Sequence, residues 1–417
     1  MKTRLLIISH VLPFPGQSGQ QMRVRNKLLA FKPDFEITFL TFAQPAQIES
    51  TRESLVPYVD HSIVMPARSS HRLLARLMRA VYGEAYVLAT GLKPSNLFIG
   101  ERELSPRRIA AHCTPTDYDI VLFEYWHAHR SLEVFQRHGI PCVLDMHDLL
   151  WQSWDRQLST HPLPWRRLLR GRLVDAYRRH EEAAWQQFDI LIAISEGEAE
   201  VVRQVVHDKP VILAPMGIDL GKWAYNWIPA EPPRLGFYGS LGGSRFNQES
   251  VMRCVKAIMP RVWAECPDSE FWIVGANPPP EIKALEADSR IHVTGFVSDV
   301  AEVLKTMTAV LCPWTGTYGF RSRIIEVMAL GVPVIATPDA VYGMGMDERG
   351  LFLGETDKDM VACGLKLLQK PQVAMKLSRL ARQQIEDKFG FEATYGHLAR
   401  VLHGACIEGQ SVTSRCV

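Results

Sequence analysis

Two arginines and a glutamate follow a glycine-containing loop in the second half of the chain. Arg321 and Arg323 follow Gly319 by two and four positions, and Glu326 lies about one turn into a helix predicted for residues 322–330. A guanidinium group can clamp phosphate oxygens, and the N-terminus of a helix favours an anion. A carboxylate accepts hydrogen bonds from hydroxyl groups. The segment therefore predicts a site for a phosphorylated, hydroxyl-rich ligand.

The elements that position these residues follow one another as strand, loop, helix and strand. Apolar runs at residues 309–312 and 332–336 predict buried strands, and Gly331 ends the helix between them. In open parallel sheets, ligands bind where the C-terminal ends of strands lead into helices. The same alternation starts twice in the chain, with strands at residues 4–9 and 235–239, each followed by a glycine-containing turn. We therefore expect an α/β protein with two parallel-sheet domains.

The first half of the chain has its own candidates at strand ends. Glu124 closes an apolar strand that starts at residue 119, and Trp126 and His127 follow it. His147 comes directly after a second apolar strand that starts at residue 141. A carboxylate and imidazoles at strand ends can contact a substrate, and an indole can stack on a sugar ring. For Glu124 the alternative is an ordinary surface carboxylate.

The segment that contains Arg321, Arg323 and Glu326 resembles the donor site of retaining, GT-B-fold glycosyltransferases of the GT4 type, also called glycosyl transferases group 1. Their pattern has two glutamates, the second followed by an Ala-x-Gly-x-Pro-Val run. Glu326 and residues 328–334 match the second glutamate and this run, whereas Tyr318 stands in place of the first. A subgroup that also lacks the first glutamate carries an Arg and a Lys before the second, where this chain has Arg321 and Arg323.

The resemblance implies the GT-B architecture, in which two Rossmann-like domains face a cleft. Residues 1–215 would form the acceptor domain and residues 216–388 the nucleotide-sugar donor domain. Residues 389–408 would form a helix that returns to the first domain, and residues 409–417 a tail.

The resemblance also assigns roles to individual residues. Catalytic roles fall to Glu124, with His127 as a neighbouring alternative, and to Arg321 and Arg323. The acceptor side would include Arg23, Trp126 and His147. The residues expected to bind the donor are Gly19, Ser240, Arg245, Phe296, Val297, Gly319, Phe320, Arg321, Arg323 and Glu326.

The activity implied by the resemblance is transfer of a sugar from a nucleoside diphosphate sugar to a glycan or lipid-linked acceptor with retained configuration, in bacterial cell-surface polysaccharide biosynthesis. Fixed positive groups stabilise the departing diphosphate. Arginines and helix amides can supply this charge, so we expect no metal and no cofactor. Two alternatives stay open: a glycosyltransferase-like protein that binds sugar nucleotides without catalysis, and a two-domain Rossmann oxidoreductase. The chain lacks the Gly-x-Gly-x-x-Gly fingerprint of dinucleotide-binding domains.

Composition limits the partners and the compartment. The net charge of +2 gives no electrostatic argument for nucleic acid. The eight cysteines show no zinc-site spacing, and no apolar run reaches the length of a membrane span, so we expect a cytoplasmic protein. Arg-rich stretches at residues 68–79 and 166–179, interleaved with leucines and aromatics, predict peripheral contact with the inner face of the plasma membrane. The alternative is that both are solvated helices packed on their domain.

Overall fold

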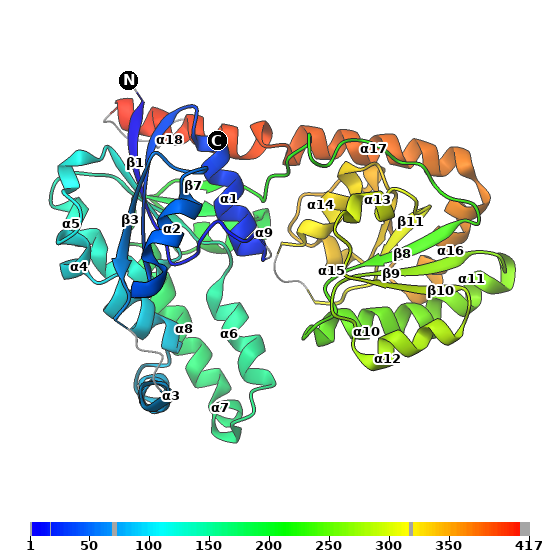
Figure 1. Cartoon of the computed structure of the whole chain (residues 1–417), viewed down its shortest axis with the longest axis horizontal. Coiled ribbons are helices and arrows are strands. Elements are labelled where there is room, and N and C mark those ends of the chain that lie inside the picture. The colour runs from blue at the N-terminus through cyan, green and yellow to red at the C-terminus, as the bar shows by residue number, and fades with distance from the viewer. Residues whose placement is uncertain (1, 17, 69–72, 317–319, 409–417) are drawn as a thin grey trace. The chain divides into compact units, whose positions relative to one another are not determined.

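The protein is described by a computed structural model, shown in Figure 1, which covers residues 2–16, 18–68, 73–316 and 320–408. The chain forms two compact units. Unit 1 comprises Met1–Pro215 and the C-terminal part from Tyr395, and unit 2 comprises Met216–Thr394.

Unit 1 is built on a seven-stranded, fully parallel sheet with the order β3-β2-β1-β4-β5-β6-β7. The central strands are buried apolar runs, because helices cover both faces of a parallel sheet. Its strands are β1 (Thr3–Ile8), β2 (Phe35–Ala43), β3 (His61–Pro66), β4 (Ile120–Glu124), β5 (Cys142–Asp145), β6 (Ile190–Ala193) and β7 (Val211–Leu213). Its helices are α1 (Gly19–Phe31), α2 (Ile48–Leu55), α3 (Leu73–Thr90), α4 (Pro106–Ala110), α5 (Leu132–Gln136), α6 (Leu150–Ser159), α7 (Pro164–Leu168), α8 (Arg170–Trp185), α9 (Glu196–Arg203) and α18 (His397–Glu408), with a π-helical turn at η2 (Asn96–Glu103). A further π-helical turn, η8 (Glu392–Gly396), spans the point where the chain returns from unit 2 to unit 1.

Unit 2 is built on a six-stranded parallel sheet with the order β10-β9-β8-β11-β12-β13. Its strands are β8 (Arg234–Tyr238), β9 (Glu270–Val274), β10 (Ile291–Gly295), β11 (Ala309–Cys312), β12 (Val334–Ala336) and β13 (Phe352–Leu353). Its helices are α10 (Arg245–Arg253), α11 (Met259–Glu265), α12 (Pro280–Lys283), α13 (Val300–Leu304), α14 (Ser322–Ala329), α15 (Pro338–Val341), α16 (Asp357–Gln369) and α17 (Pro371–Phe389).

Both sheets reverse their strand order once, and this reversal locates the candidate sites. In unit 1 the order turns between β1 and β4, and in unit 2 it turns between β8 and β11. The loops that leave neighbouring strands at such a switch point run to opposite faces of the sheet and leave a crevice for a ligand. Glu124 ends β4, and the segment with Arg321 and Arg323 follows β11.

The two parallel-sheet domains expected from the sequence are confirmed. The division between the units falls between Pro215 and Met216, and the chain re-enters unit 1 at Tyr395, whereas the sequence analysis placed the return at residue 389. The returning helix α18 contacts the start of the chain, where Thr3 Oγ1 lies 2.7 Å from His403 Nδ1. The predicted tail, residues 409–417, lies outside the described residues. Among the described helices, none combines the length and the apolar character that crossing a bilayer demands.

Candidate functional site

On unit 2, Arg321 and Arg323 stand at the start of α14, each against an aromatic ring. The guanidinium carbon of Arg321 lies 5.0 Å from the ring centre of Phe246 and 5.3 Å from that of Trp314. That of Arg323 lies 4.6 Å from the ring centre of Tyr238. Stacking fixes the plane of a guanidinium group and leaves its N–H edge available for an oxyanion. Among the described residues, no side chain caps the first turn of α14. The positive end of the helix dipole lies at this turn and favours an anion.

Glu326 lies on α14, which follows β11, and it contacts β8, the neighbouring strand at the switch point. Its Oε2 accepts a hydrogen bond of 3.0 Å from the hydroxyl of Tyr238, the last residue of β8. Burial raises the pKa of Glu326 above its ordinary value, although the nearby Arg323 and the Tyr238 hydrogen bond oppose the shift. The carboxyl group is therefore oriented by protein contacts before any ligand arrives.

The loop after β11 is fixed by hydrogen bonds to its neighbours. Trp314 donates from Nε1 to Asn247 Oδ1 over 3.1 Å, and Gly316 N donates to Asp339 over 2.7 Å. Arg321 Nη2 donates to the Gly316 carbonyl over 2.9 Å. Gly319, predicted to bind the donor, lies outside the described residues, and Phe320 is half-buried against Phe389 with ring centres 6.0 Å apart.

The other predicted donor residues of unit 2 lie at the C-terminal ends of strands. Ser240 follows β8, and its carbonyl accepts a hydrogen bond of 2.7 Å from Asn247 Nδ2. Arg245 begins α10 and is exposed, with its Nε 2.7 Å from Glu249 on the same helix. Phe296 and Val297 follow β10, and Phe296 is 79% exposed. A large aromatic ring so open to solvent at a strand end is a surface on which a planar ligand can stack.

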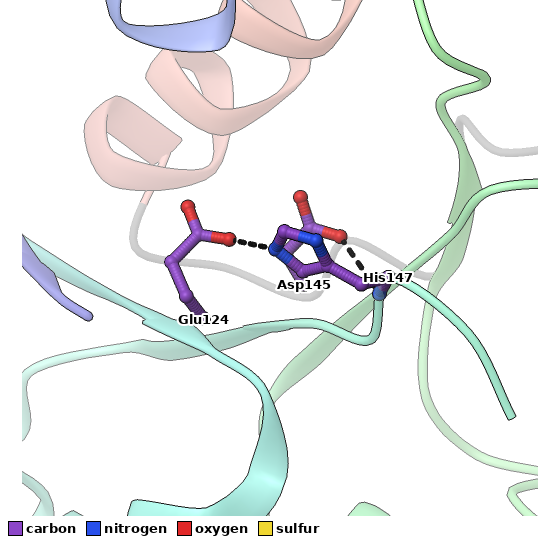
Figure 2. A group of neighbouring side chains, drawn as sticks. All are labelled: Glu124, Asp145 and His147. Carbon is purple, nitrogen blue, oxygen red and sulfur yellow. Dashed lines mark hydrogen bonds and ion pairs between the residues drawn. The ribbon is translucent and has the colours of Figure 1, made fainter. Parts of the chain in front are cut away.

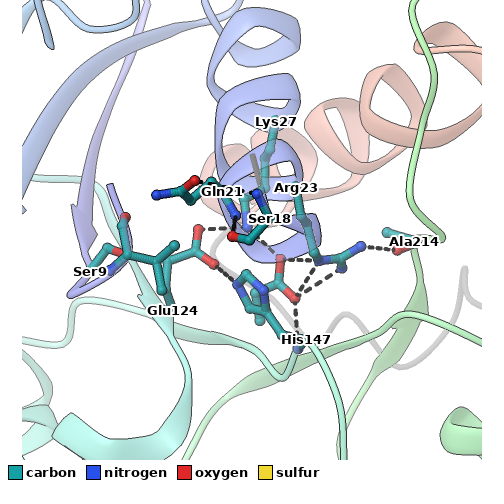
Figure 3. A network of polar contacts seen from close by, with 10 residues as sticks. Ser9, Ser18, Gln21, Arg23, Lys27, Glu124, His147 and Ala214 are labelled. Carbon is teal, nitrogen blue, oxygen red and sulfur yellow. Dashed lines mark hydrogen bonds and ion pairs between the residues drawn. The ribbon is translucent and has the colours of Figure 1, made fainter. Parts of the chain in front are cut away.

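On unit 1, five side chains of the predicted site region form one buried, charged network (Figures 2 and 3). Arg23 of α1 binds Asp145 at the end of β5, with Nη2–Oδ1 2.9 Å and Nε–Oδ2 3.0 Å. Lys27, one turn further along α1, lies 2.6 Å from Glu124 Oε1 and also pairs with Asp145. The Nε2 of His147 contacts the other oxygen of Glu124.

Burial raises the pKa of Glu124 and of Asp145, but the cations beside them outweigh it. Lys27 and His147 hold the pKa of Glu124 below its ordinary value. Arg23 and Lys27 hold that of Asp145 well below its ordinary value. Both carboxylates are therefore ionised, and their negative charges are balanced by the neighbouring cations. Neither carboxyl group holds a proton that it could donate as a general acid.

This network changes the role that the sequence suggested for Glu124, Arg23 and His147. The side chain of Glu124 has no exposed surface, and those of Arg23 and His147 are 1% and 2% exposed. Glu124 is therefore neither a surface carboxylate nor an open substrate contact in this structure; it orients the imidazole of His147.

Next to the network, imidazole and phenol rings pack against one another. The Tyr125 and His147 rings stack with centres 4.3 Å apart, and the His10 and His127 rings lie 5.4 Å apart. Tyr125 and His147 both have positive φ angles, 68° and 59°, which residues with a Cβ seldom adopt and which concentrate at functional sites. Burial holds the pKa of His127 well below its ordinary value and lowers that of His10 to about 4. Both imidazoles are thus neutral at pH 7.

Two further predicted residues of unit 1 lie elsewhere. Trp126 is only 2% exposed, and its ring packs on Tyr177 with centres 5.5 Å apart, so it is a core residue rather than a platform for a sugar. Gly19 is the exposed first residue of α1, whose N-cap Ser18 forms a capping box with Gln21. A Cβ at Gly19 would meet no atom within 4 Å, so the position leaves room for a neighbouring group.

Glu124, Asp145 and His147 are close enough to hold a metal ion, since their ligand atoms lie within 4.8 Å of one another. Lys27 and Arg23 already compensate the two carboxylates, so a cation would have to displace an ammonium or guanidinium group. The chain also has two Asp-x-Asp triplets, at residues 117–119 and 357–359, and one aspartate of each is paired with an arginine. Asp119 pairs with Arg4, and Asp357 pairs with Arg253. The donor set therefore does not fit a resident metal.

Sequence reasoning missed several residues of both sites. Lys27 lies four positions after Arg23, on the same face of α1, and Asp145 lies two positions before His147, so local spacing could have indicated both. Tyr238, Phe246 and Trp314 come together only through the strand order, and no local pattern points to them.

The structure describes the side chains of the second Arg-rich stretch, residues 166–179, but not most of those of the first, residues 68–79. The side chains at 71–79, which carry most of the first stretch, lie outside the described residues. In the second stretch Arg166 is buried and pairs with Glu84 at 2.7 Å, and Arg170 and Arg178 pair with Asp155 and Glu182. The exposed members with no ion pair among the described residues are Arg167, Arg172 and Arg179.

Comparison with known proteins gives one family match and many structural neighbours. Residues 232–370, most of unit 2, match the model of the family Glycosyl transferases group 1. No curated protein matches the chain by sequence.

Solved structures of glycosyltransferases share the fold along the whole chain. Sucrose-phosphate synthase from Thermosynechococcus elongatus is 18% identical with a TM-score of 0.63, covering 97% of this chain and 100% of its own. HepE of Anabaena in complex with UDP is 15% identical with a TM-score of 0.59, at 97% and 100% coverage. WaaG, a glycosyltransferase involved in lipopolysaccharide biosynthesis, is 15% identical with a TM-score of 0.57, at 96% and 100% coverage. The fold is therefore GT-B, as the sequence predicted.

Proposed function

We propose that this protein is a retaining glycosyltransferase of the GT4 type that transfers a sugar from a nucleoside diphosphate sugar to a glycan or a lipid-linked acceptor. The observation that carries the proposal is the cluster at the start of α14. Arg321, Arg323 and Glu326 lie together at the switch point of unit 2, inside the segment that matches glycosyl transferases group 1.

The chemistry of this cluster suits a departing diphosphate. Negative charge grows on the diphosphate as the bond to the sugar breaks, and charges fixed in advance stabilise that state more than the ground state. Arg321, Arg323 and the N-terminus of α14 supply positive charge without a metal ion. Glu326 accepts hydroxyl groups of the ribose, and the exposed ring of Phe296 offers a surface for the base. The neighbour HepE was solved with UDP and with UDP-glucose, so uridine nucleotides are the first donors to test.

The acceptor belongs on unit 1 in this proposal, and the pathway is synthesis of cell-surface polysaccharide on the cytoplasmic side of the membrane. The exposed arginines Arg167, Arg172 and Arg179 support peripheral contact with an anionic leaflet. The neighbour WaaG acts in lipopolysaccharide biosynthesis, a related class of pathway.

A second candidate is sugar-nucleotide binding without turnover. It is favoured by the closed network of unit 1, in which Glu124 pairs with both His147 and Lys27 instead of facing solvent. The group 1 match of unit 2 favours both candidates over an oxidoreductase.

The test is a turnover assay with a panel of nucleoside diphosphate sugars and acceptor glycans, read by release of the nucleoside diphosphate. We expect turnover with at least one donor, an unchanged anomeric configuration by NMR, and equal rates with and without EDTA. Binding of a donor without release would establish the second candidate. Loss of activity in EDTA with recovery on adding a divalent ion would contradict the metal-free mechanism, and an inverted product would contradict retention.

A further inference from the structure

A cavity of about 540 Å³ lies within unit 1, and none of the predicted site residues lines it. It is formed by α6, α7 and the segment that follows α3. Its walls carry two cations, an indole and several hydrogen-bonding side chains. The lining residues are Lys93, Pro94, Ser95, Trp154, Gln157, Thr160, His161, Pro162 and Arg166.

The two cations of this cavity, Lys93 and Arg166, both lie against the ring of Trp154, but in the described part of the chain only Arg166 is paired with a carboxylate. Lys93 Nζ lies 5.5 Å from the ring centre of Trp154, and the guanidinium carbon of Arg166 lies 5.4 Å from it. Arg166 is neutralised by Glu84, which it binds through Nε and Nη2 at 3.1 and 2.7 Å. Lys93, in contrast, has no carboxylate within ion-pair distance among the described residues. The cavity therefore carries one uncompensated ammonium group.

An ammonium group held away from water without a counter-ion is unfavourable. Burial lowers the pKa of Lys93 to about 8, even though the carboxylates of Glu181 and Asp148 oppose the shift from a distance. An anion entering the cavity would relieve this cost, because it would supply the missing ion pair in a partly desolvated environment.

The backbone before Lys93 is fixed, so the ammonium group is positioned in advance. Gly91 has a φ of +76°, and a Cβ there would lie 2.5 Å from the Cβ of Ala176 on α8. Its carbonyl accepts a hydrogen bond of 3.2 Å from Nε1 of Trp154, which belongs to α6. The next amide, of Leu92, donates to Thr90 Oγ1 over 3.1 Å.

We propose that this cavity binds an oxyanion, a phosphate or carboxylate group, with Lys93 as its ion-pair partner. Ser95, Gln157 and Thr160 supply hydroxyl and amide groups to the polar body that carries the anion. The oxyanion can come from a soluble phosphorylated or acidic sugar, or from a lipid headgroup. The inference concerns binding alone, so it stands or falls independently of glycosyl transfer.

The test compares two variants by calorimetric titration with inorganic phosphate and with D-glucuronate. Lys93→Met keeps the apolar stem that covers Trp154 and removes only the charge. The matched control is Arg107→Gln, which removes an exposed positive charge from α4, outside the cavity and outside both Arg-rich stretches. We expect millimolar binding of at least one probe to the wild type, at least about tenfold weaker binding to Lys93→Met, and no change in Arg107→Gln.

The pH dependence provides a second readout. D-glucuronate keeps its charge between pH 7 and 9, so only protein groups can change its affinity in this range. The charged groups around Lys93 are Glu181, Asp148 and Arg156, with His161 and Arg166 in the same lining. Burial raises the pKa of Glu181 to about 8 as well, so Lys93 and Glu181 both lose a proton in this range, and each loss disfavours a bound anion. Affinity should therefore fall as the pH rises through about 8, and the fall should be smaller in Lys93→Met than in the wild type.

Vesicles distinguish the two sources of the oxyanion. If a lipid headgroup is the ligand, phosphatidic acid vesicles should bind the wild type more strongly than Lys93→Met, and phosphatidylcholine vesicles should bind neither. If the ligand is soluble, the wild type and Lys93→Met should differ in affinity for phosphate or glucuronate but not in binding to either kind of vesicle. Absence of saturable binding to the wild type in every arm, or equal weakening in Lys93→Met and Arg107→Gln, would overturn the proposal.

Discussion

Arg321 and Arg323 are two positions apart, yet each is held by a different part of unit 2. Arg321 lies over Phe246 of α10 and Trp314 of the loop after β11, and Arg323 lies over Tyr238 of β8. The aromatic faces restrict the planes of both guanidinium groups, and the Gly316 carbonyl additionally holds Nη2 of Arg321. Such preorganisation favours binding of an oxyanion, because little side-chain entropy remains to be lost.

We predict that Arg321→Ala and Arg323→Ala each weaken binding of a nucleoside diphosphate. A charge-assisted hydrogen bond contributes about 1.5–3 kcal/mol, so the dissociation constant should rise about tenfold or more. Calorimetry with UDP and GDP measures the effect. Arg349→Ala is the matched control, because Arg349 is an exposed arginine of the same unit and pairs with Asp347. Equal affinity in the wild type and both variants would contradict the assignment.

Glu326 and Tyr238 should act as a pair in nucleotide binding. Glu326→Gln leaves an amide, which accepts hydroxyl groups less well than a carboxylate, and Tyr238→Phe removes the 3.0 Å hydrogen bond that orients it. We expect both variants to lose affinity for UDP, and the double variant to lose less than the sum of the two. Additive losses, or retained affinity in Glu326→Gln, would show that the carboxyl group does not bind the ribose.

The sequence indicates residues of a site when neighbours along the chain contact the same ligand. Arg321, Arg323 and Glu326 meet this condition because they share the start of one helix. Tyr238 is 88 positions before Glu326 and reaches it only because β8 and β11 are adjacent in the sheet. Trp126 shows the opposite error, since an aromatic residue after a strand end can equally fill the core, as its 2% exposure shows.

At the scale of elements, apolar runs predicted the strands well, because a strand of a parallel sheet is buried on both faces. The strand predicted at residues 309–312 is β11, with the same ends. Capping of α9 shows that tertiary contacts also shape the elements. Ser195 accepts a hydrogen bond from Glu198 N, but among the described contacts the Glu198 side chain makes no reciprocal hydrogen bond to the Ser195 amide. Burial raises the pKa of Glu198 well above its ordinary value, with Asp148 beside it, so tertiary contacts determine its position.

The charged network joins α1, β4 and β5, and Lys27 is its central cation. We predict that Lys27→Met destabilises the folded state by about 3–5 kcal/mol, because it leaves buried carboxylates with too little positive charge. Denaturant unfolding measures the change. Arg4→Met is the control, because its pair with Asp119 is largely exposed, at 46% and 37%, and should contribute less than about 1 kcal/mol. A loss in Lys27→Met no larger than in Arg4→Met would contradict the role of the network.

The same network predicts the direction of the pH dependence. The pKa of Asp145 is held below its ordinary value of 3.8, so its contribution to stability is present above that value and is lost as the pH falls through the folded-state pKa. The difference in unfolding free energy between the wild type and Lys27→Met should therefore be largest near neutral pH and shrink below about pH 4. A difference that grows on acidification would contradict this interpretation.

For the whole molecule, the recurrence of strand and helix was sufficient to predict two parallel sheets, because each half has its own apolar pattern. The order of the strands was beyond the sequence, since spacing along one chain does not specify which strands are neighbours. The return of the chain to unit 1 matters for stability. Tyr395, Leu398 and Leu402 are each 0% exposed, so unit 1 depends on residues that follow unit 2 in the sequence.

The last prediction concerns the independence of the units. Unit 2 is continuous from Met216 to Thr394 and has its own apolar core, so this segment alone should fold cooperatively and bind a nucleoside diphosphate. Residues 1–215 alone should be much less stable than the same segment joined by a flexible linker to residues 395–408. Without α18, apolar surface covered by three buried side chains is exposed, and each such side chain contributes about 1.5–3 kcal/mol. Circular dichroism during denaturation compares the two forms of unit 1. Equal stability would show that α18 is dispensable, and a disordered segment 216–394 would show that unit 2 requires unit 1 to fold.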